Sequence, residues 1–182
     1  MRSLQQIIDL QKAFDTVQYS ILLKRLYEAG VHGRAWRLLK SWYNSPKSLV
    51  KIRDSFSSII TLERGVLQGS VLSPILFLLV VDPLLHYLQG EGLGPSVGAI
   101  YAGTFAHADD IRTVSSSITT LQDQMESVHR FAVQNGLSLN PTKCEVLLVS
   151  STKPTENTPT AILGGQALVA LCCGRSLFFV EL

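Results

Sequence analysis

Three aspartates lie where an apolar stretch of the chain ends or turns, and they constrain the fold more than any other feature of the 182 residues. Asp9 closes the stretch Leu4–Leu10, which has the pattern of a short buried strand. The pair Asp109–Asp110 follows a strand-like stretch, residues 99–108, and residues 111–114 have the pattern of its return partner. A carboxylate at the end of a hydrophobic strand costs desolvation free energy unless a partner compensates its charge. The fold therefore has to supply such a partner.

Clustered carboxylates repel one another, and a divalent cation removes that penalty. Hard oxygen ligands suit Mg²⁺, which keeps several waters and is held by a few carboxylates together with substrate phosphates. Two such ions, roughly 3.5–4 Å apart, activate an attacking hydroxyl and stabilise the leaving oxygen in nucleotidyl transfer. An Asp-Asp pair is also ordinary turn chemistry. The aspartates alone therefore leave both interpretations open.

Residue spacing predicts four helices. Ser20 is expected to cap the first helix and Gly30 to stop it, with three leucines inward. The third follows Ser73–Pro74 and is apolar nearly all round, which predicts burial. The fourth starts near Ser117 and ends at Asn135. The second covers residues 34–43 and is expected to bury Ala35, Leu38, Leu39 and Trp42.

Strand patterns complete the prediction of the fold class. A hairpin is expected around Asp54–Ser55, and a final strand over Glu145–Val149. Strands and helices are mixed without a βαβ rhythm. This predicts an α+β fold, with helices packed on one face of a small antiparallel sheet.

Composition and charge narrow the class of protein. Hydrophobic residues make up 46% and charged residues 16% of the chain, which is typical of a globular protein and excludes a disordered one. Between Lys24 and Arg64, nine basic residues face three acidic ones, a net charge of +6. A basic surface with interleaved Trp36 and Trp42 suits a polyanion, although a solvated helix face explains the same pattern.

The three cysteines form neither a disulfide framework nor a zinc pattern, which favours an intracellular setting. No membrane segment is expected, because the most apolar stretch, Val71–Val81, ends at Asp82–Pro83 and a bilayer span needs roughly 20 apolar residues.

Four segments in consistent order and spacing resemble the palm motifs of reverse transcriptases of the non-LTR (LINE-type) retrotransposons. They are residues 9–17 (DLQKAFDTV), 64–74 (RGVLQGSVLSP), 107–110 (HADD) and 136–144 (GLSLNPTKC). The resemblance spans residues 5–149 and implies a right-hand polymerase palm. It also implies an RNA-directed DNA polymerase that extends a DNA primer on an RNA template with deoxynucleoside triphosphates, using two Mg²⁺ ions or Mn²⁺ in their place.

The resemblance assigns roles to individual residues. Asp9, Asp109 and Asp110 would be the catalytic metal ligands, completed by the backbone carbonyl of Leu10. The ring of Phe14 would reject a 2′-hydroxyl on the incoming sugar. Nucleotide contacts would come from Gln68, Gly69 and Lys143, and nucleic-acid contacts from Arg64, Lys47, Lys51 and Arg53. Lys143 is equally explained as a solvated lysine, and Asp15 as a hydrogen-bonding turn residue.

The sequence also departs from the family pattern. Only eight residues precede Asp9, where the family has a long fingers region, and no thumb pattern follows residue 149. The expected domains are a partial reverse-transcriptase domain (1–150), a polar linker (151–160) and a divergent apolar tail (161–182) of frameshift or splice origin. Negligible polymerase activity is expected on this ground.

Several alternatives stay open. A non-catalytic nucleic-acid-binding remnant, a poorly folded chain with exposed strand edges, and a group II intron-type enzyme all agree with parts of the pattern. A retroelement protein would act in the cytoplasm and nucleus. The sequence leaves the oligomeric state open.

Overall fold

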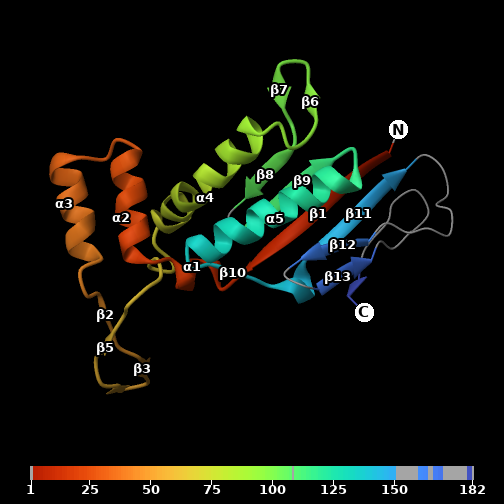
Figure 1. Ribbon diagram of the computed structural model, residues 1–182. Coiled ribbons are helices and arrows are strands. Elements are labelled where there is room, and N and C mark those ends of the chain that lie inside the picture. The colour runs from red at the N-terminus through yellow and green to blue at the C-terminus, as the bar shows by residue number, and fades with distance from the viewer. Residues whose placement is uncertain (1, 108, 151–159, 164–165, 170–179, 182) are drawn as a thin grey trace. The chain divides into compact units, whose positions relative to one another are not determined.

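A computed structural model describes residues 2–107, 109–150, 160–163, 166–169 and 180–181 (Figure 1). The chain divides into two compact units. The first comprises residues 1–13 and 81–182, and the second residues 14–80.

The first unit is built on an antiparallel sheet whose central strand is β1 (Arg2–Gln11). On one side β1 pairs with β9 (Asp110–Ser115), which in turn pairs with β8 (Thr104–His107). On its other side it pairs with β11 (Glu145–Ser150) and, at its end, with β10 (Ser138–Leu139). The predicted strands at Leu4–Leu10, 111–114 and Glu145–Val149 are thus confirmed, whereas only Thr104–His107 of the predicted strand 99–108 pairs with β9.

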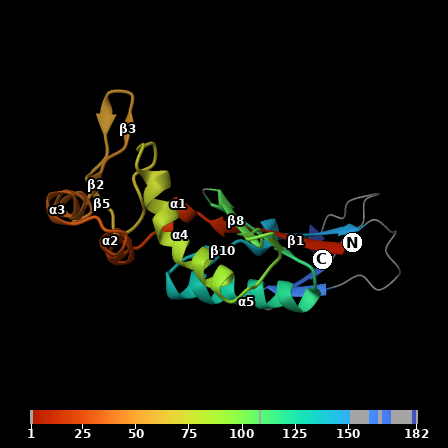
Figure 2. The same cartoon turned by 90° about the horizontal axis from the view of Figure 1, so that it is seen from above.

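Alternating burial in β1 explains how this sheet is covered. Leu4, Gln6, Ile8 and Leu10 are buried on one face, while the residues between them are more exposed. Helix α5 (Ile118–Gln134) packs along the sheet (Figures 1 and 2). It buries one helical stripe, which is formed by Leu121, Met125, Val128 and Ala132.

The ends of α5 match its predicted signals. Ser117 caps the helix, because its Oγ accepts a hydrogen bond from the Thr120 amide at 3.1 Å. Asn135 follows the last turn, and Gly136 adopts a left-handed φ of 65°.

Two smaller sheets belong to the first unit. Strands β6 (Ser96–Val97) and β7 (Ile100–Tyr101) form a hairpin. Strands β12 (Thr160–Leu163), β13 (Gln166–Val169) and β14 (Val180–Glu181) form the other sheet. Gln122 links α5 to β12 by two hydrogen bonds of 2.9 Å. Its side-chain Nε2 donates to the backbone carbonyl of Ile162, and its Oε1 accepts from the backbone amide of Ile162. Residues 151–159 of the predicted linker lie outside the described residues.

The second unit begins with the short helix α1 (Ala13–Thr16), whose first residue lies at the unit boundary, and the helical pair α2 (Tyr19–Glu28) and α3 (Gly33–Trp42). A nested hairpin follows, in which β2 (Lys47–Ser48) pairs with β5 (Ile60–Thr61) and β3 (Lys51–Ile52) with β4 (Ser55–Phe56). The predicted hairpin is therefore present, with its turn at Arg53–Asp54.

Two predictions for the helical pair are wrong. The first helix starts at Tyr19, and Gln18 takes the N-cap position in place of Ser20, without a side-chain cap bond. Helix α3 buries none of its residues: Leu38 is 53% and Trp42 46% exposed. Within the second unit α3 packs mainly on α2, so most of its apolar residues have no second surface to cover them.

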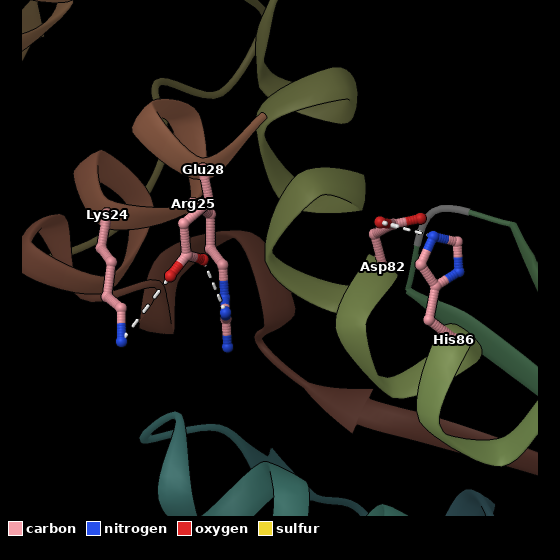
Figure 3. Close-up of polar contacts among 5 residues, drawn as sticks. All are labelled: Lys24, Arg25, Glu28, Asp82 and His86. Atoms are coloured by element: carbon pink, nitrogen blue, oxygen red, sulfur yellow. Dashed lines mark hydrogen bonds and ion pairs between the residues drawn. The ribbon is translucent and has the colours of Figure 1, made fainter. Parts of the chain in front are cut away.

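Helix α4 (Ser73–Gly90) starts at the predicted Ser73 and continues through Pro83. It is not buried on all sides: Leu76 and Phe77 are inside, whereas Ile75 is 55% exposed. The helix is long and apolar enough to cross a membrane when judged by length and composition alone. The core helix of a globular protein can meet the same two criteria. Its polar side includes Asp82, whose carboxylate lies 3.7 Å from the imidazole of His86 (Figure 3).

Candidate active site

The aspartates at the ends of β1 and β9 lie together at one end of the first unit's sheet, which is called its acidic edge below. Asp9 in β1 and Asp110 in β9 occupy directly opposed positions in the antiparallel ladder. Directly opposed residues project their side chains from the same face, with their Cβ atoms about 4.5–5.5 Å apart. Because Ile8 and Leu10 point to the buried face, Asp9 and Asp110 belong to the opposite face of the sheet.

Asp109 occupies the turn between β8 and β9, as predicted, and is half-buried. His107, the last residue of β8, lies opposite Asp110 and is exposed. The sheet edge thus carries an imidazole and two carboxylates in one cross-strand row, with a third carboxylate in the adjoining turn.

Lys143 supplies a positive charge to this edge. It ends the 3-10 helix η1 (Pro141–Lys143), and its Nζ lies 4.0 Å from Oδ1 of Asp9. The lysine side chain is 67% exposed and that of Asp9 only 19%. One largely solvated ammonium group therefore compensates only part of the negative charge of the paired carboxylates.

The backbone around Asp9 is fixed by two neighbours. Its carbonyl accepts a hydrogen bond from the Asn140 amide at 2.9 Å, and Leu10 pairs with Leu139 in β10 while its side chain is buried. The thiol of Cys144 is buried beside this strand. Burial raises the pKa of the Cys144 thiol, a backbone hydrogen bond with Asp9 lowers it in part, and the charge of Asp9 raises it further. The thiol accordingly stays neutral and acts as packing.

These residues fit a hard divalent cation. Asp9 and Asp110 offer carboxylate oxygens on the face of the sheet opposite Ile8 and Leu10, and the solvated Lys143 offsets only part of their mutual repulsion. Among the residues that the structure describes, no three His, Cys, Asp or Glu side chains are arranged to hold a metal. The donor set matches an ion that takes two protein carboxylates and completes its coordination with water and phosphate oxygens.

The glycine-bearing loop between β5 and α4 (residues 62–72) belongs to the second unit, where it is hydrogen-bonded to α1 and to the residue that follows α1. The amide of Gly65 donates to the Val17 carbonyl at 2.8 Å, and the amide of Val66 to the Phe14 carbonyl at 2.7 Å. Gly65 has a φ of +99°, and a Cβ built there would lie 3.1 Å from the Asp15 backbone. Only glycine therefore allows this close approach without strain.

The side chain of Gln68 is oriented by Asp15. Its Nε2 donates to Oδ1 of Asp15 at 2.6 Å, and both side chains are exposed. Gly69 follows with a φ of +80° and open space around its Cα. Sequence reasoning assigned Asp15 a local turn bond and missed this pairing, because no pattern links residues 53 positions apart.

Phe14 also belongs to the second unit. Its ring packs on that of Phe77 in α4, with 5.1 Å between centroids. Arg64 forms an isolated β-bridge with Gln18.

The three basic residues of the nested hairpin are exposed. Lys47 and Lys51 lie on its strands, with the Lys51 ammonium 5.5 Å from the Phe56 ring centroid. Arg53 lies at its turn with a φ of 54°. The structure thus groups Asp9, Asp109, Asp110 and Lys143 in one unit, and the remaining predicted contact residues in the other.

Comparison with known proteins identifies the family. Residues 3–166 match the family model described as reverse transcriptase (RNA-dependent DNA polymerase). The chain is 32% identical over 146 residues to the Pol polyprotein of the R2 retrotransposable element of Popillia japonica, and 31% identical over 148 residues to that of Nasonia vitripennis. The matches cover 79% and 81% of this chain.

A polymerase from the mobile element jockey of Drosophila funebris is 28% identical over 165 residues, or 88% of this chain. This chain spans only 20%, 14% and 18% of the length of the three relatives.

Solved telomerase structures share the fold. The Candida tropicalis telomerase in complex with an RNA fragment gives a TM-score of 0.64 at 13% identity, covering 91% of this chain and 28% of that one. The apo Candida tropicalis telomerase gives 0.59 at 15% identity, covering 92% and 34%. The mixed helices and antiparallel sheet are therefore an α+β, palm-like arrangement. By its match over residues 3–166 and its kinship with non-LTR retrotransposon polymerases, this chain belongs to the reverse transcriptase family.

Proposed function

We propose that this chain carries the nucleotidyl-transfer site of an RNA-directed DNA polymerase, which extends a DNA primer on an RNA template with deoxynucleoside triphosphates. The observation that carries the proposal is the direct opposition of Asp9 and Asp110 in the β1–β9 ladder. Membership of the reverse transcriptase family supports the same reaction.

Asp9, Asp109 and Asp110, with the carbonyl of Leu10, would hold two divalent ions. Mg²⁺ suits these oxygen donors best, and Mn²⁺ can replace it. The bound ions would supply activation of the primer hydroxyl and stabilisation of the leaving oxygen. The family generally depends on divalent metals, and the choice of Mg²⁺ is part of the proposal.

The other residues would bind and position the substrates. Lys143, which lies 4.0 Å from Asp9, would meet the negative charge of the triphosphate and of the departing pyrophosphate. The ring of Phe14, held against Phe77, would exclude a 2′-hydroxyl from the sugar. Gln68, oriented by Asp15, would contact the template and nascent base pair, and Gly69 would let the backbone approach it.

A metal-binding measurement tests the proposed site directly. Mn²⁺ binding to the full chain is followed by electron paramagnetic resonance, in which bound Mn²⁺ loses the signal of the free ion. The double variant Asp9→Asn, Asp110→Asn keeps the side-chain volumes and removes both charges, so it should bind Mn²⁺ much more weakly. Asp123→Asn, which removes an exposed charge on α5 away from the site, is the matched control.

Primer extension on an RNA template, with Mg²⁺ or Mn²⁺, provides the second readout. Any extension by the wild-type chain should disappear in the double variant and persist in the Asp123→Asn control. Equal Mn²⁺ binding by all three proteins, or extension that survives loss of both carboxylates, would contradict the proposal.

A second candidate function is non-catalytic nucleic-acid binding by the second unit. It is favoured by the exposed cations of the nested hairpin, Lys47, Lys51 and Arg53, and by Arg64. RNA binding that is independent of Mg²⁺ and weakens steeply with salt would support this function. Loss of RNA binding in the double aspartate variant would count against it.

A further inference from the structure

A groove between α2 and α3 is not used by the proposed reaction. It has a volume of about 530 Å³ and is open to solvent. Its lining combines aromatic, aliphatic and charged side chains, contributed by Ser20, Leu23, Lys24, Tyr27, Glu28, Trp36 and Lys40.

Two aromatic rings form the apolar part of this groove. Tyr27 is 58% exposed, and its ring meets that of Trp36 edge-on, with 6.1 Å between centroids and 79° between planes. Trp36 is held in place because its indole N–H donates to the Leu23 carbonyl at 3.1 Å. The His32 ring also contacts that of Tyr27, tilted by 59° with 4.3 Å between centroids. The rings are therefore oriented before any ligand arrives, which lowers the entropic cost of stacking on them.

Positive charge surrounds the rings. The Lys40 ammonium lies 4.9 Å from the Trp36 ring centroid, within the range of a cation–π contact. Across α2 and α3 there are five basic residues and one acid, Glu28. Glu28 is already paired, since its carboxylate lies 2.9 Å from Arg25 and 3.8 Å from Lys24 (Figure 3). The groove is thus net positive, with its single carboxylate compensated.

We propose that this groove binds single-stranded nucleic acid, with an unpaired base stacked on the Trp36 ring beside Tyr27 and the adjoining phosphates facing Lys24 and Lys40. Aromatic rings interleaved with lysines are how proteins hold unpaired strands without reading their sequence. A duplex keeps its base faces stacked internally and offers them no ring surface. An acidic peptide would match the charge but would leave the aromatic rings unused.

The groove lies entirely within the second unit and uses none of the aspartates. Binding is therefore measured in EDTA, where a metal-dependent active site makes no contribution. Failure of the groove and failure of the proposed polymerase site are then separate results.

The two tryptophans of the chain allow a direct optical test. In the full-length Trp42→Phe variant, Trp36 is the sole tryptophan. Adding twelve-nucleotide oligouridine or oligothymidine should quench its fluorescence saturably, because a stacked base quenches indole emission. A blunt RNA duplex of the same length should quench it far less. Oligouridine and oligothymidine compared side by side show whether the groove distinguishes RNA from DNA.

Fluorescence anisotropy of a labelled oligouridine tests the contribution of each side chain. Trp36→Ala should raise the Kd roughly tenfold or more, since stacking contributes strongly for each base. Trp42→Ala removes an exposed tryptophan from the same helix, outside the groove lining, and should leave the Kd unchanged. Trp36→Phe keeps an aromatic face while losing the bond to Leu23, so it should retain most of the binding even if the helical pair is less stable.

Lys40→Gln removes the proposed phosphate contact, together with the ammonium group near Trp36, and keeps both rings. It should weaken binding and lower the slope of log Kd against log salt by about 0.7. Equal effects of Trp36→Ala and Trp42→Ala, no quenching of Trp36, or equal quenching by the duplex would overturn the proposal. Tighter binding of polyglutamate than of oligouridine, with the same dependence on Trp36, would assign the groove to acidic protein segments.

Discussion

The opposed carboxylates of β1 and β9 make a prediction in which one substitution has opposite effects with and without metal. In Asp110→Asn the side chain keeps its size and loses its charge. Without a divalent cation, Asp9 and Asp110 repel each other across the ladder, so this substitution should stabilise the protein. With Mg²⁺ bound, the same substitution removes a ligand, so the wild type should become the more stable protein.

The magnitudes follow from the structure. Like charges directly opposed on a sheet cost on the order of 0.2–1 kcal/mol. The lower half of that range applies here, because Lys143 lies 4.0 Å from Asp9 and offsets part of the repulsion. For a chain of this length, about 0.5 kcal/mol raises the Tm by roughly 1–2 °C. Mg²⁺ at about ten times its Kd stabilises the wild type by about 1.4 kcal/mol, or roughly 3–6 °C.

Thermal melts followed by circular dichroism measure both effects on the same two proteins, in EDTA and in Mg²⁺. The Asp110→Asn variant should melt above the wild type in EDTA and below it in Mg²⁺. Asp123→Asn, on the exposed side of α5, should follow the wild type in both buffers. A variant that melts below the wild type in EDTA would show that Asp110 is satisfied without metal. An equal Mg²⁺ shift in all three proteins would place the cation elsewhere.

Three further outcomes test the local structure. Gly65→Ala should cost about 1–3 kcal/mol, because its φ of +99° and a Cβ 3.1 Å from backbone are both strained; Gly98→Ala, with a φ of +63° and open space, should lower the Tm by less. Ser117→Ala should cost about 1 kcal/mol through loss of the α5 cap, measured by urea unfolding, whereas Ser116→Ala should cost nothing. Burial raises the pKa of the Tyr43 hydroxyl above its usual 10.0. The stability that the neutral hydroxyl contributes is therefore complete below about pH 10 and is lost as the pH rises through the folded-state pKa. Tyr43→Phe should flatten this alkaline decline in Tm, and an unchanged decline would refute the prediction.

The parts of the fold that the sequence predicted correctly are those in which local signals agree with tertiary packing. In α5 the cap at Ser117, the apolar stripe and the stop at Asn135 specify the same helix, and the sheet supplies a surface for the stripe. In β1 the apolar content of Leu4–Leu10 indicated the strand, but the buried face came from the structure, because Gln6 is buried and Ile7 lies on the other face. Such agreement leaves little freedom for another structure.

Predictions failed where a local pattern had no tertiary partner to act on. The apolar stripe of α3 has the same spacing as that of a buried helix, yet within the second unit α3 packs mainly on α2. Ser20 is a good capping residue, but the helix begins before it, since Gln18 accepts the Leu22 amide at 3.0 Å through its carbonyl. Periodicity therefore reports which face is apolar, and the rest of the fold decides whether that face is covered.

The candidate site shows the same limit for contacts distant in sequence. Motifs identified Asp9 and Asp110 separately, but only strand pairing opposes them, and that register depends on the buried faces of two strands about a hundred residues apart. The bond between Asp15 and Gln68 likewise requires α1 and the glycine-bearing loop to meet, which the positive φ of Gly65 permits. Asp15 is one of the residues that the motif alone leaves ambiguous, and its partner is the reason to assign it an orienting role rather than a metal-binding one. The acidic strand ends and the orienting pair thus depend on different contacts: the first on the register between β1 and β9, and the second on the close approach of Gly65 to Asp15.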